Sequence, residues 1–201
     1  MPFPLISGDR SHFRTVNEFA RDTGWLHGFM TFMAKDGIAL LAVTLLAGWW
    51  IARRNNSPQQ VATAVWGALA ALVALALVQP IANAADEQRP FVGHPGVLKL
   101  ISHAADVGFP SDHATGAGAI AAALFFVSWR LGLLTALIAA LIAFSRVYVG
   151  VHFPQDVLAG LALGAVVAIA GVFLVVPLLS RLAAALTRTP LRSLIVSSTT
   201  G

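Results

Sequence analysis

Long apolar stretches separated by short polar segments dominate the chain from about residue 36 onward. Because about 20 consecutive apolar residues cross the hydrocarbon core of a bilayer as a helix, these stretches predict membrane spans. Small residues such as Ala and Gly recur within them and favour close packing between membrane helices. We therefore expect an all-α fold, an integral membrane helical bundle of about five transmembrane helices. The five expected spans cover residues 36–52, 60–83, 111–130, 131–146 and 154–180.

The first 35 residues follow a different pattern, in which aromatic residues stand among charged ones. Within them, residues 13–33 indicate an N-terminal amphipathic helix or helix pair along the membrane interface, and a frayed, partly ordered tail is the alternative. No apolar core of a secretory signal peptide is evident near the start. We expect an interfacial segment (1–35), a membrane-embedded functional domain (36–192) and a disordered tail (193–201).

The composition supports a membrane protein. Hydrophobic residues make up 57% of the chain and charged residues 11%, whereas soluble domains carry about 25% charged residues. The absence of cysteine excludes disulfides, thiolate metal sites and a cysteine nucleophile. The net charge of +4 is modest, and in a membrane protein basic residues report orientation first. We expect no nucleic-acid partner.

Basic residues at the span ends indicate how the bundle is oriented in a cell membrane. The positive-inside rule places the side with more of them in the cytoplasm, and the N-terminus and the 84–110 segment outside. Four basic residues of the N-terminal segment would then also lie outside, which weakens the charge argument. The basic residues assigned to the inside are Arg53, Arg54, Arg130, Arg181, Arg188 and Arg192.

Three polar clusters lie near span ends, and the predicted topology places them on one face of the membrane. Ionisable side chains at membrane depth are costly, which makes them candidates for function. We expect the clusters to form one site. They are Gln88-Arg89-Pro90, Pro110-Ser111-Asp112-His113, and Ser145-Arg146 with His152 and Asp156.

The second and third clusters combine an anion site with a histidine pair. Ser111 is a good N-cap, and helix first-turn amides bind anions, with His113 in the same turn; a cap without further function is the alternative. His152 and Asp156 are spaced i, i+4, so the carboxylate can fix the imidazole tautomer and leave the other nitrogen free to attack. A purely structural pair is the alternative, and metal ligation by His113, His152 and Asp156 lacks a recognised zinc spacing.

Arg89 and Arg146 complete the candidate site. Guanidinium groups bind phosphate oxygens in a bidentate manner and stabilise the charge on a transferring phosphoryl group. For each residue taken alone, anchoring at the membrane interface is an equally good interpretation. Next to two histidines, phosphate binding is favoured.

These residues, in this order, resemble the three-part signature of the type 2 phosphatidic acid phosphatase superfamily, in its bacterial membrane branch. The resemblance spans roughly residues 82–164. The third part, Ser-Arg, five residues, His, three residues and Asp, is highly specific. The three parts are Gln88-Arg89-Pro90-Phe91, Phe109-Pro110-Ser111-Asp112-His113, and Ser145-Arg146 with His152 and Asp156.

The resemblance implies a role for each residue. His152 would attack phosphorus and form a phosphohistidine, Asp156 would orient it, and His113 would protonate the leaving oxygen and then activate water. No metal or other cofactor would be needed, and the site would face the extracytoplasmic side of the plasma membrane. The phosphate would be held by Arg89, Ser111, Asp112 and Arg146.

The sequence departs from the family pattern at two positions. The family's first motif usually begins with a Lys seven residues before the Arg, where this chain has Ala82, so one phosphate contact is missing or is supplied by Lys99 or Gln88. Asp112 replaces the Gly of the broad family, and this form resembles the undecaprenyl-diphosphatase branch associated with bacitracin resistance.

We therefore expect a lipid phosphatase that converts undecaprenyl (polyprenyl) diphosphate to the monophosphate and recycles the carrier for cell-wall synthesis. The alternatives are a phosphatase for phosphatidylglycerophosphate or phosphatidic acid, and a non-catalytic lipid transporter that uses the same polar site. A soluble haloperoxidase of the related fold is disfavoured by the spans. The expected partners are a lipid phosphate substrate and membrane lipids.

Overall fold

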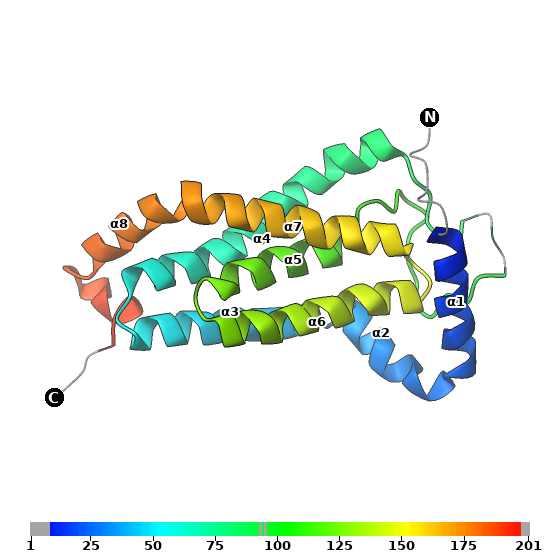
Figure 1. The fold of residues 1–201 in the computed structure, drawn as a ribbon, viewed down its shortest axis with the longest axis horizontal. Coiled ribbons are helices and arrows are strands. Elements are labelled where there is room, and N and C mark those ends of the chain that lie inside the picture. The colour runs from blue at the N-terminus through cyan, green and yellow to red at the C-terminus, as the bar shows by residue number, and fades with distance from the viewer. Residues whose placement is uncertain (1–8, 93, 95, 198–201) are drawn as a thin grey trace.

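The computed structural model describes residues 9–92, 94 and 96–197, which form an elongated helical bundle (Figure 1). This described part of the chain contains no strand. The predicted all-α fold is therefore confirmed. The elements in chain order are α1 (Asp9–Asp22), η1 (Gly24–Leu26), α2 (His27–Lys35), α3 (Ile38–Arg54), α4 (Pro58–Ala85), α5 (Asp112–Phe125), α6 (Trp129–Tyr148), α7 (Pro154–Leu174), α8 (Val176–Leu186) and η2 (Pro190–Leu194).

The lengths of the helices do not confirm the predicted count of five spans. Three helices of the described chain, α4, α6 and α7, are long and apolar enough to cross a membrane, and the bent pair formed by Gly24–Lys35 and Ile38–Arg54 makes up to four. The pair bends by 56°. Helix α5 has 14 residues and is about 21 Å long at 1.5 Å per residue, which is shorter than the hydrocarbon core of about 30 Å. The predicted spans that began at residues 111 and 154 are therefore shorter than expected.

Helix α5 lies in the centre of the bundle, in contact with α4, α6 and α7. Its contact with α7 depends on glycine, because the two backbones approach each other too closely for a side chain. A Cβ atom on Gly118 would clash with the backbone of Leu161, and one on Gly164 would clash with the backbone of Thr115. Small residues allow such close packing. This contact fixes α5 and α7 relative to each other, and both helices carry predicted site residues at their first turns.

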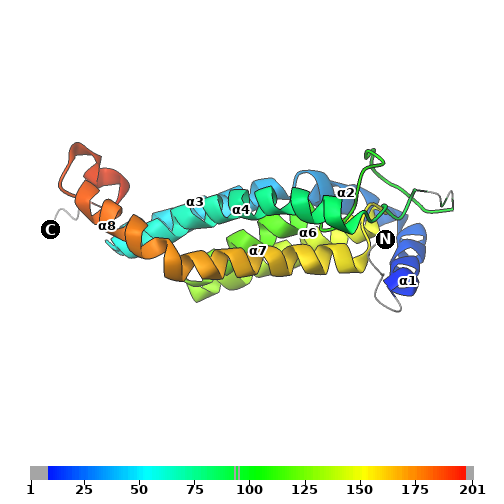
Figure 2. The same cartoon turned by 90° about the horizontal axis from the view of Figure 1, so that it is seen from above.

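Helix α1 lies across one end of the bundle, while α8 and η2 lie at the other end (Figures 1 and 2). Its buried face, which includes Phe13 and Asn17, faces the protein. The Asn17 amide donates to the Leu98 carbonyl at 2.9 Å and accepts from the Leu98 N–H at 3.0 Å. Exposed aromatic side chains of this region lie on all three elements: Phe19 on α1, Trp25 on η1, and Phe29 and Phe32 on α2. That the segment lies along the membrane interface stays a prediction.

The end of the chain packs against α3. The Trp49 indole donates to the Leu194 carbonyl at 3.0 Å, the Ser197 N–H donates to the Arg53 carbonyl at 3.2 Å, and Ile195 is buried. These contacts involve residues 193–197 of the segment that was predicted to be a disordered tail, because the chain turns back after α8 (Figure 1); the tail boundary stays a prediction. Residues 198–201 lie outside the described residues. The other boundary predictions stay predictions.

Candidate active site

The fold brings the three polar clusters together at the α1 end of the bundle. Arg89 lies in the segment between α4 and α5, and Ser111 immediately precedes α5. Arg146 lies in the last turn of α6, His152 in the turn between α6 and α7, and Asp156 in the first turn of α7. One hydrogen bond links two of these segments directly, because the Ser111 N–H donates to the Asp156 carbonyl at 3.0 Å.

His152 and Asp156 form a buried pair. The Nδ1 atom of His152 lies 3.2 Å from Oδ2 of Asp156, and the two side chains are 2% and 1% exposed. The same Oδ2 accepts from the Phe153 N–H at 2.8 Å, which fixes the carboxylate at the start of α7. A carboxylate on Nδ1 holds the proton there and leaves the lone pair on Nε2. The imidazole is thus oriented for attack through Nε2.

Arg89 is the partner of that second nitrogen. Its Nη1 lies 3.0 Å from Nε2 of His152 and also donates to the Val151 carbonyl at 3.1 Å. Its Nε donates to Oδ1 of Asp106 at 2.6 Å, and its Nη2 donates to the Val107 carbonyl at 3.3 Å. The guanidinium, which is 6% exposed, is therefore held directly against the predicted nucleophile.

Two buried donors of the site lack a partner among the described residues: Ser111 Oγ and Arg146 Nε. Ser111 occupies the N-cap position of α5, but its side chain makes no cap hydrogen bond. Arg146 uses Nη1 to donate to the Ala34 carbonyl at 2.9 Å. Buried polar groups nearly always have hydrogen-bond partners. The Ser111 and Arg146 donors lie near Arg89 and His152, and a bound anion could accept a hydrogen bond from each of them.

The electrostatic surroundings of His152 show which groups are gathered near it. Burial lowers the pKa of His152 well below its usual value, and the charges of Arg146, Arg89, His103 and His113 lower it further, in that order. His152 is thereby kept in the neutral form that a nucleophile requires. His113 is half-buried and Asp112 exposed at the start of α5, which places both toward the mouth of the site.

Comparison with known proteins decides the family. The sequence model of the PAP2 superfamily matches residues 63–180, a segment that contains every predicted site residue. The chain belongs to the PAP2 superfamily. It is 34% identical over 155 residues to the undecaprenyl-diphosphatase BcrC of Bacillus subtilis, which is 77% of this chain and 78% of that protein. It is 33% identical over 152 residues to the bacitracin transport permease protein BcrC of Bacillus licheniformis, 76% of this chain and 73% of that one.

The fold agrees with this assignment. The crystal structure of LpxE from Aquifex aeolicus superposes with a TM-score of 0.67 and covers 86% of this chain and 99% of that one, at 24% identity. The resemblance predicted from the motifs is thus confirmed at the level of family and fold. The assignment of roles to single residues stays a prediction.

Two side chains of this PAP2 site were not predicted, His103 and Asp106. Asp106 forms the ion pair with Arg89, and the His103 ring lies 6.4 Å from the His152 ring, centroid to centroid. Both lie in the irregular polar segment before α5, where the sequence spacing of two residues does not predict whether their side chains are close. Their spacing of i, i+3 in a loop gave no signal. Only the tertiary fold brings them to Arg89 and His152.

A buried acidic group lies behind Asp156. Gln155 donates through Nε2 to Oε1 and Oε2 of Glu87 at 2.7 and 2.8 Å, and its N–H donates to Oδ1 of Asp9 at 3.0 Å. Burial raises the pKa of both Glu87 and Asp9. The Glu87 carboxylate is turned to Gln155, and its charge acts on Asp156.

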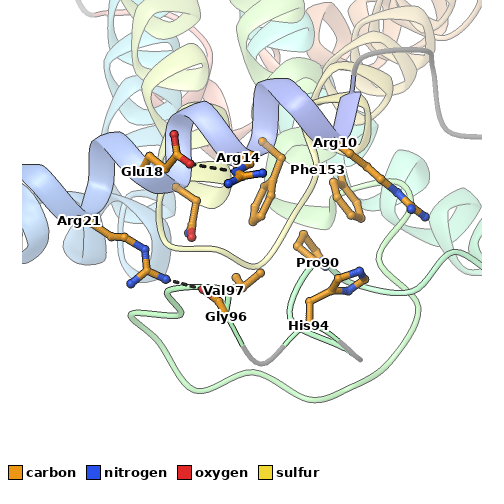
Figure 3. A pocket seen from close by; sticks show the side chains of 11 residues that line it. Arg10, Arg14, Glu18, Arg21, Pro90, His94, Gly96, Val97 and Phe153 are labelled. Atoms are coloured by element: carbon orange, nitrogen blue, oxygen red, sulfur yellow. Dashed lines mark hydrogen bonds and ion pairs between the residues drawn. The ribbon is translucent and has the colours of Figure 1, made fainter.

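A cavity of about 750 Å³ lies beside the site, between α1 and Pro90, His94, Gly96 and Val97. Figure 3 shows arginine side chains of α1 along the cavity, with Phe153 close to that helix and Pro90 and Val97 across from it. Phe153 and Pro90 directly follow His152 and Arg89 in the sequence, so the cavity is next to the turn that carries His152. None of the seven predicted site residues lines it. The cavity and the predicted site are therefore neighbouring but separate features.

Proposed function

We propose that this chain is a membrane lipid phosphatase that hydrolyses undecaprenyl (polyprenyl) diphosphate to the monophosphate through a phosphohistidine at His152. The observation that carries the proposal is the buried His152–Asp156 pair, with Nδ1 3.2 Å from the carboxylate and Nε2 facing a guanidinium at 3.0 Å. Tautomer control on one nitrogen and a phosphate-binding group at the other are what phosphoryl transfer to an imidazole needs.

In the first step, the lone pair of His152 Nε2 forms a bond to the terminal phosphorus while the bond from phosphorus to the leaving oxygen breaks. His113 donates a proton to that oxygen, so the lipid monophosphate leaves in a stable form. In this structure the Nε2 lone pair accepts a hydrogen bond from Nη1 of Arg89. Attack therefore requires Arg89 to turn its Nη1 donors from the imidazole to the phosphate oxygens, which places the charge where it accumulates in the transition state.

In the second step, His113, now neutral, takes a proton from a water molecule, whose oxygen attacks the phosphohistidine. The phosphorus–nitrogen bond breaks, inorganic phosphate leaves and His152 becomes neutral again. Asp156 balances the positive charge of the phosphorylated imidazole throughout. Ser111 Oγ and Arg146 Nε, buried without other partners among the described residues, would donate to the phosphoryl oxygens, with the first-turn amides of Asp112 and His113 beside them.

The substrate class rests on the relatives. A protein named undecaprenyl-diphosphatase aligns over more than three quarters of both chains, and the membrane-spanning helices suit a substrate held in the bilayer. A glycerolipid phosphatase would use the same residues, and a transporter would need no nucleophile. A panel of pure lipids assayed in detergent, with and without His152, separates these functions.

In that panel, undecaprenyl diphosphate should release phosphate clearly faster than phosphatidylglycerophosphate or phosphatidic acid. His152→Ala should abolish release from all lipids while the thermal unfolding temperature stays close to that of the wild type. A glycerolipid as the best substrate would reassign the substrate. Phosphate release by the His152→Ala protein would disprove the nucleophile.

We further infer that the site faces the extracytoplasmic side of the plasma membrane, supported by the arginines at the far end of the bundle and the positive-inside rule. The chain has no cysteine, so single introduced cysteines report sidedness without background. In intact cells, a membrane-impermeant maleimide should label Glu18→Cys on α1 and not Arg54→Cys at the end of α3. The reverse pattern would place the site in the cytoplasm.

A further inference from the structure

The segment between α4 and α5 brings an additional imidazole to the site. The His103 ring lies 6.4 Å from that of His152, centroid to centroid, at an interplanar angle of 79°. Its side chain is 23% exposed, so His103 lies at the mouth of the site rather than inside it. Burial and the charges of Arg89 and Arg146 lower its pKa. His103 is therefore near the same two guanidinium groups that surround His152.

A carboxylate holds this imidazole and Arg89 together. Oδ1 of Asp106 lies 3.8 Å from Nδ1 of His103 and 2.6 Å from Nε of Arg89. The same Nδ1 lies 3.3 Å from the Ala104 carbonyl. Because Nδ1 faces these acceptors, Nε2 is the nitrogen that can meet a ligand. The Ala104 carbonyl thus holds Nδ1 of His103, with the Asp106 carboxylate nearby.

The position at which the family's first motif carries a lysine is apolar in this chain. Ala82 is buried within α4. Of the two substitutes predicted from the sequence, Lys99 places its ammonium 4.1 Å over the Phe91 ring, and Gln88 is exposed. Lys99 is thus engaged with an aromatic ring, and no side-chain hydrogen bond joins Gln88 to His152 or Arg89 among the described residues. His103, in contrast, lies against His152.

We propose that His103 is a substrate-contacting residue that donates from Nε2 to a non-bridging oxygen of the phosphoryl group, in the role left open by Ala82. The inference rests on the proposed function, because it names a contact of the same site. Both nitrogens of the ring donate when it is protonated, Nδ1 to Ala104 or Asp106 and Nε2 to the phosphate. The negative charge of a bound phosphate favours that form against the opposing charges of Arg89 and Arg146.

The test compares two histidine variants of the full chain in lipid nanodiscs. His103→Ala should lower kcat/KM for undecaprenyl diphosphate about 10- to 100-fold, the range for loss of a hydrogen bond to a charged group. It should also weaken binding of inorganic orthovanadate, a mimic of pentacoordinate phosphorus, by a similar factor. His94→Ala is the matched control, because His94 is exposed on the same segment and bonds to the Val92 carbonyl. It should change both values less than twofold.

A rescue experiment separates phosphate contact from a structural role. In the His103→Ala protein, Ala82→Lys should recover at least tenfold of the lost kcat/KM and of the vanadate affinity, whereas Ala82→Met, of similar length and without charge, should recover neither. Equal behaviour of the Lys and Met variants would overturn the inference, and so would a His103→Ala protein that matches the His94→Ala control. If the wild type hydrolyses no lipid phosphate, the proposed function fails, and vanadate affinity alone decides whether His103 contacts the anion.

Discussion

Asp156→Asn removes one charge from the candidate site with little change of shape. In the wild type, Oδ2 accepts both from the Phe153 N–H at 2.8 Å and from Nδ1 of His152 at 3.2 Å. Two donors converge on that atom, so the amide oxygen of the new Asn should take its place and keep the imidazole tautomer. The amide NH₂ then takes the place of Oδ1, which has no hydrogen-bond partner among the described residues. The variant therefore tests the charge rather than the orientation.

The expected loss follows from the positive charge that His152 acquires when Nε2 bonds to phosphorus. At 3.2 Å and an effective dielectric constant of about 20, a carboxylate stabilises that charge by about 5 kcal/mol. The lower bound is a hydrogen bond to a charged group, about 1.5 kcal/mol. At 1.36 kcal/mol for each tenfold, the first step should slow by about 10-fold to several thousand-fold.

The assay measures phosphate release in a single turnover and the amount of phosphoryl-enzyme trapped during the reaction. The trapped phosphoryl-enzyme is tested for its stability in acid and in base. Asp156→Asn should lower the amount and rate of base-stable phosphohistidine, while the thermal unfolding temperature changes little, because loss of repulsion from Glu87 and Asp9 offsets the unpaired amide. Glu87→Gln is the matched control, since it neutralises a neighbouring buried carboxylate that touches Gln155 and not His152. Asp156→Asn activity within twofold of the wild type would refute the reasoning.

Two further predictions concern pH and packing. Burial and four neighbouring positive or titratable groups lower the pKa of His152. The imidazole should therefore stay neutral on acidification. The midpoint of the acid limb of kcat/KM should lie below about pH 6.5, the ordinary pKa of histidine. On acidification the unfolded chain binds a proton at His152 before the folded chain does, so the stability that His152 contributes above about pH 6.5 should be lost as the pH falls. An acid limb of kcat/KM with its midpoint at or above about pH 6.5 would contradict the buried environment assigned to His152. Gly164→Ala would place a Cβ against the backbone of Thr115 and Ala119 and should cost about 1–3 kcal/mol of stability and most activity, as measured by thermal unfolding and phosphate release. Gly116→Ala in α5, where no atom lies within 4 Å of the new Cβ, should be neutral or slightly stabilising.

Hydrophobic pattern was enough to predict the helical bundle but not the number of its spans. The stretch that begins at Ser111 has the composition of a span, yet α5 ends at Phe125 and a new helix starts at Trp129. Hydropathy does not distinguish a short helix enclosed by other helices from a helix that crosses the bilayer. The 56° bend between Gly24–Lys35 and Ile38–Arg54 was equally hidden, because a break in direction leaves the apolar content unchanged.

The proximity of the candidate-site residues could be predicted from the sequence, because they occur in short motifs with fixed spacing; their roles stay predictions. His152 and Asp156 are four residues apart at a helix start, and this spacing is enough to bring them into contact. The pairing of Arg89 with Asp106 could not be predicted in this way. The two residues are 17 apart in an irregular segment, and only the path of that segment between α4 and α5 brings them together.

The partners of the two arginines explain how the site keeps its charge. Arg89 donates to the carbonyls of Val151 and Val107, and Arg146 donates to the carbonyl of Ala34. Carbonyl acceptors orient a guanidinium without neutralising it, so the positive charge remains for an incoming phosphate. Asp106 is the one charged acceptor among these partners of the two arginines. Its side chain is 56% exposed, so solvent screens its carboxylate and a phosphate could displace it from Arg89. Asp106 is bound at Nε of Arg89 and His152 at Nη1, so a phosphate that draws the Nη1 donors to itself would release Nε2 of His152, and binding of the anion and exposure of that nitrogen would be one event.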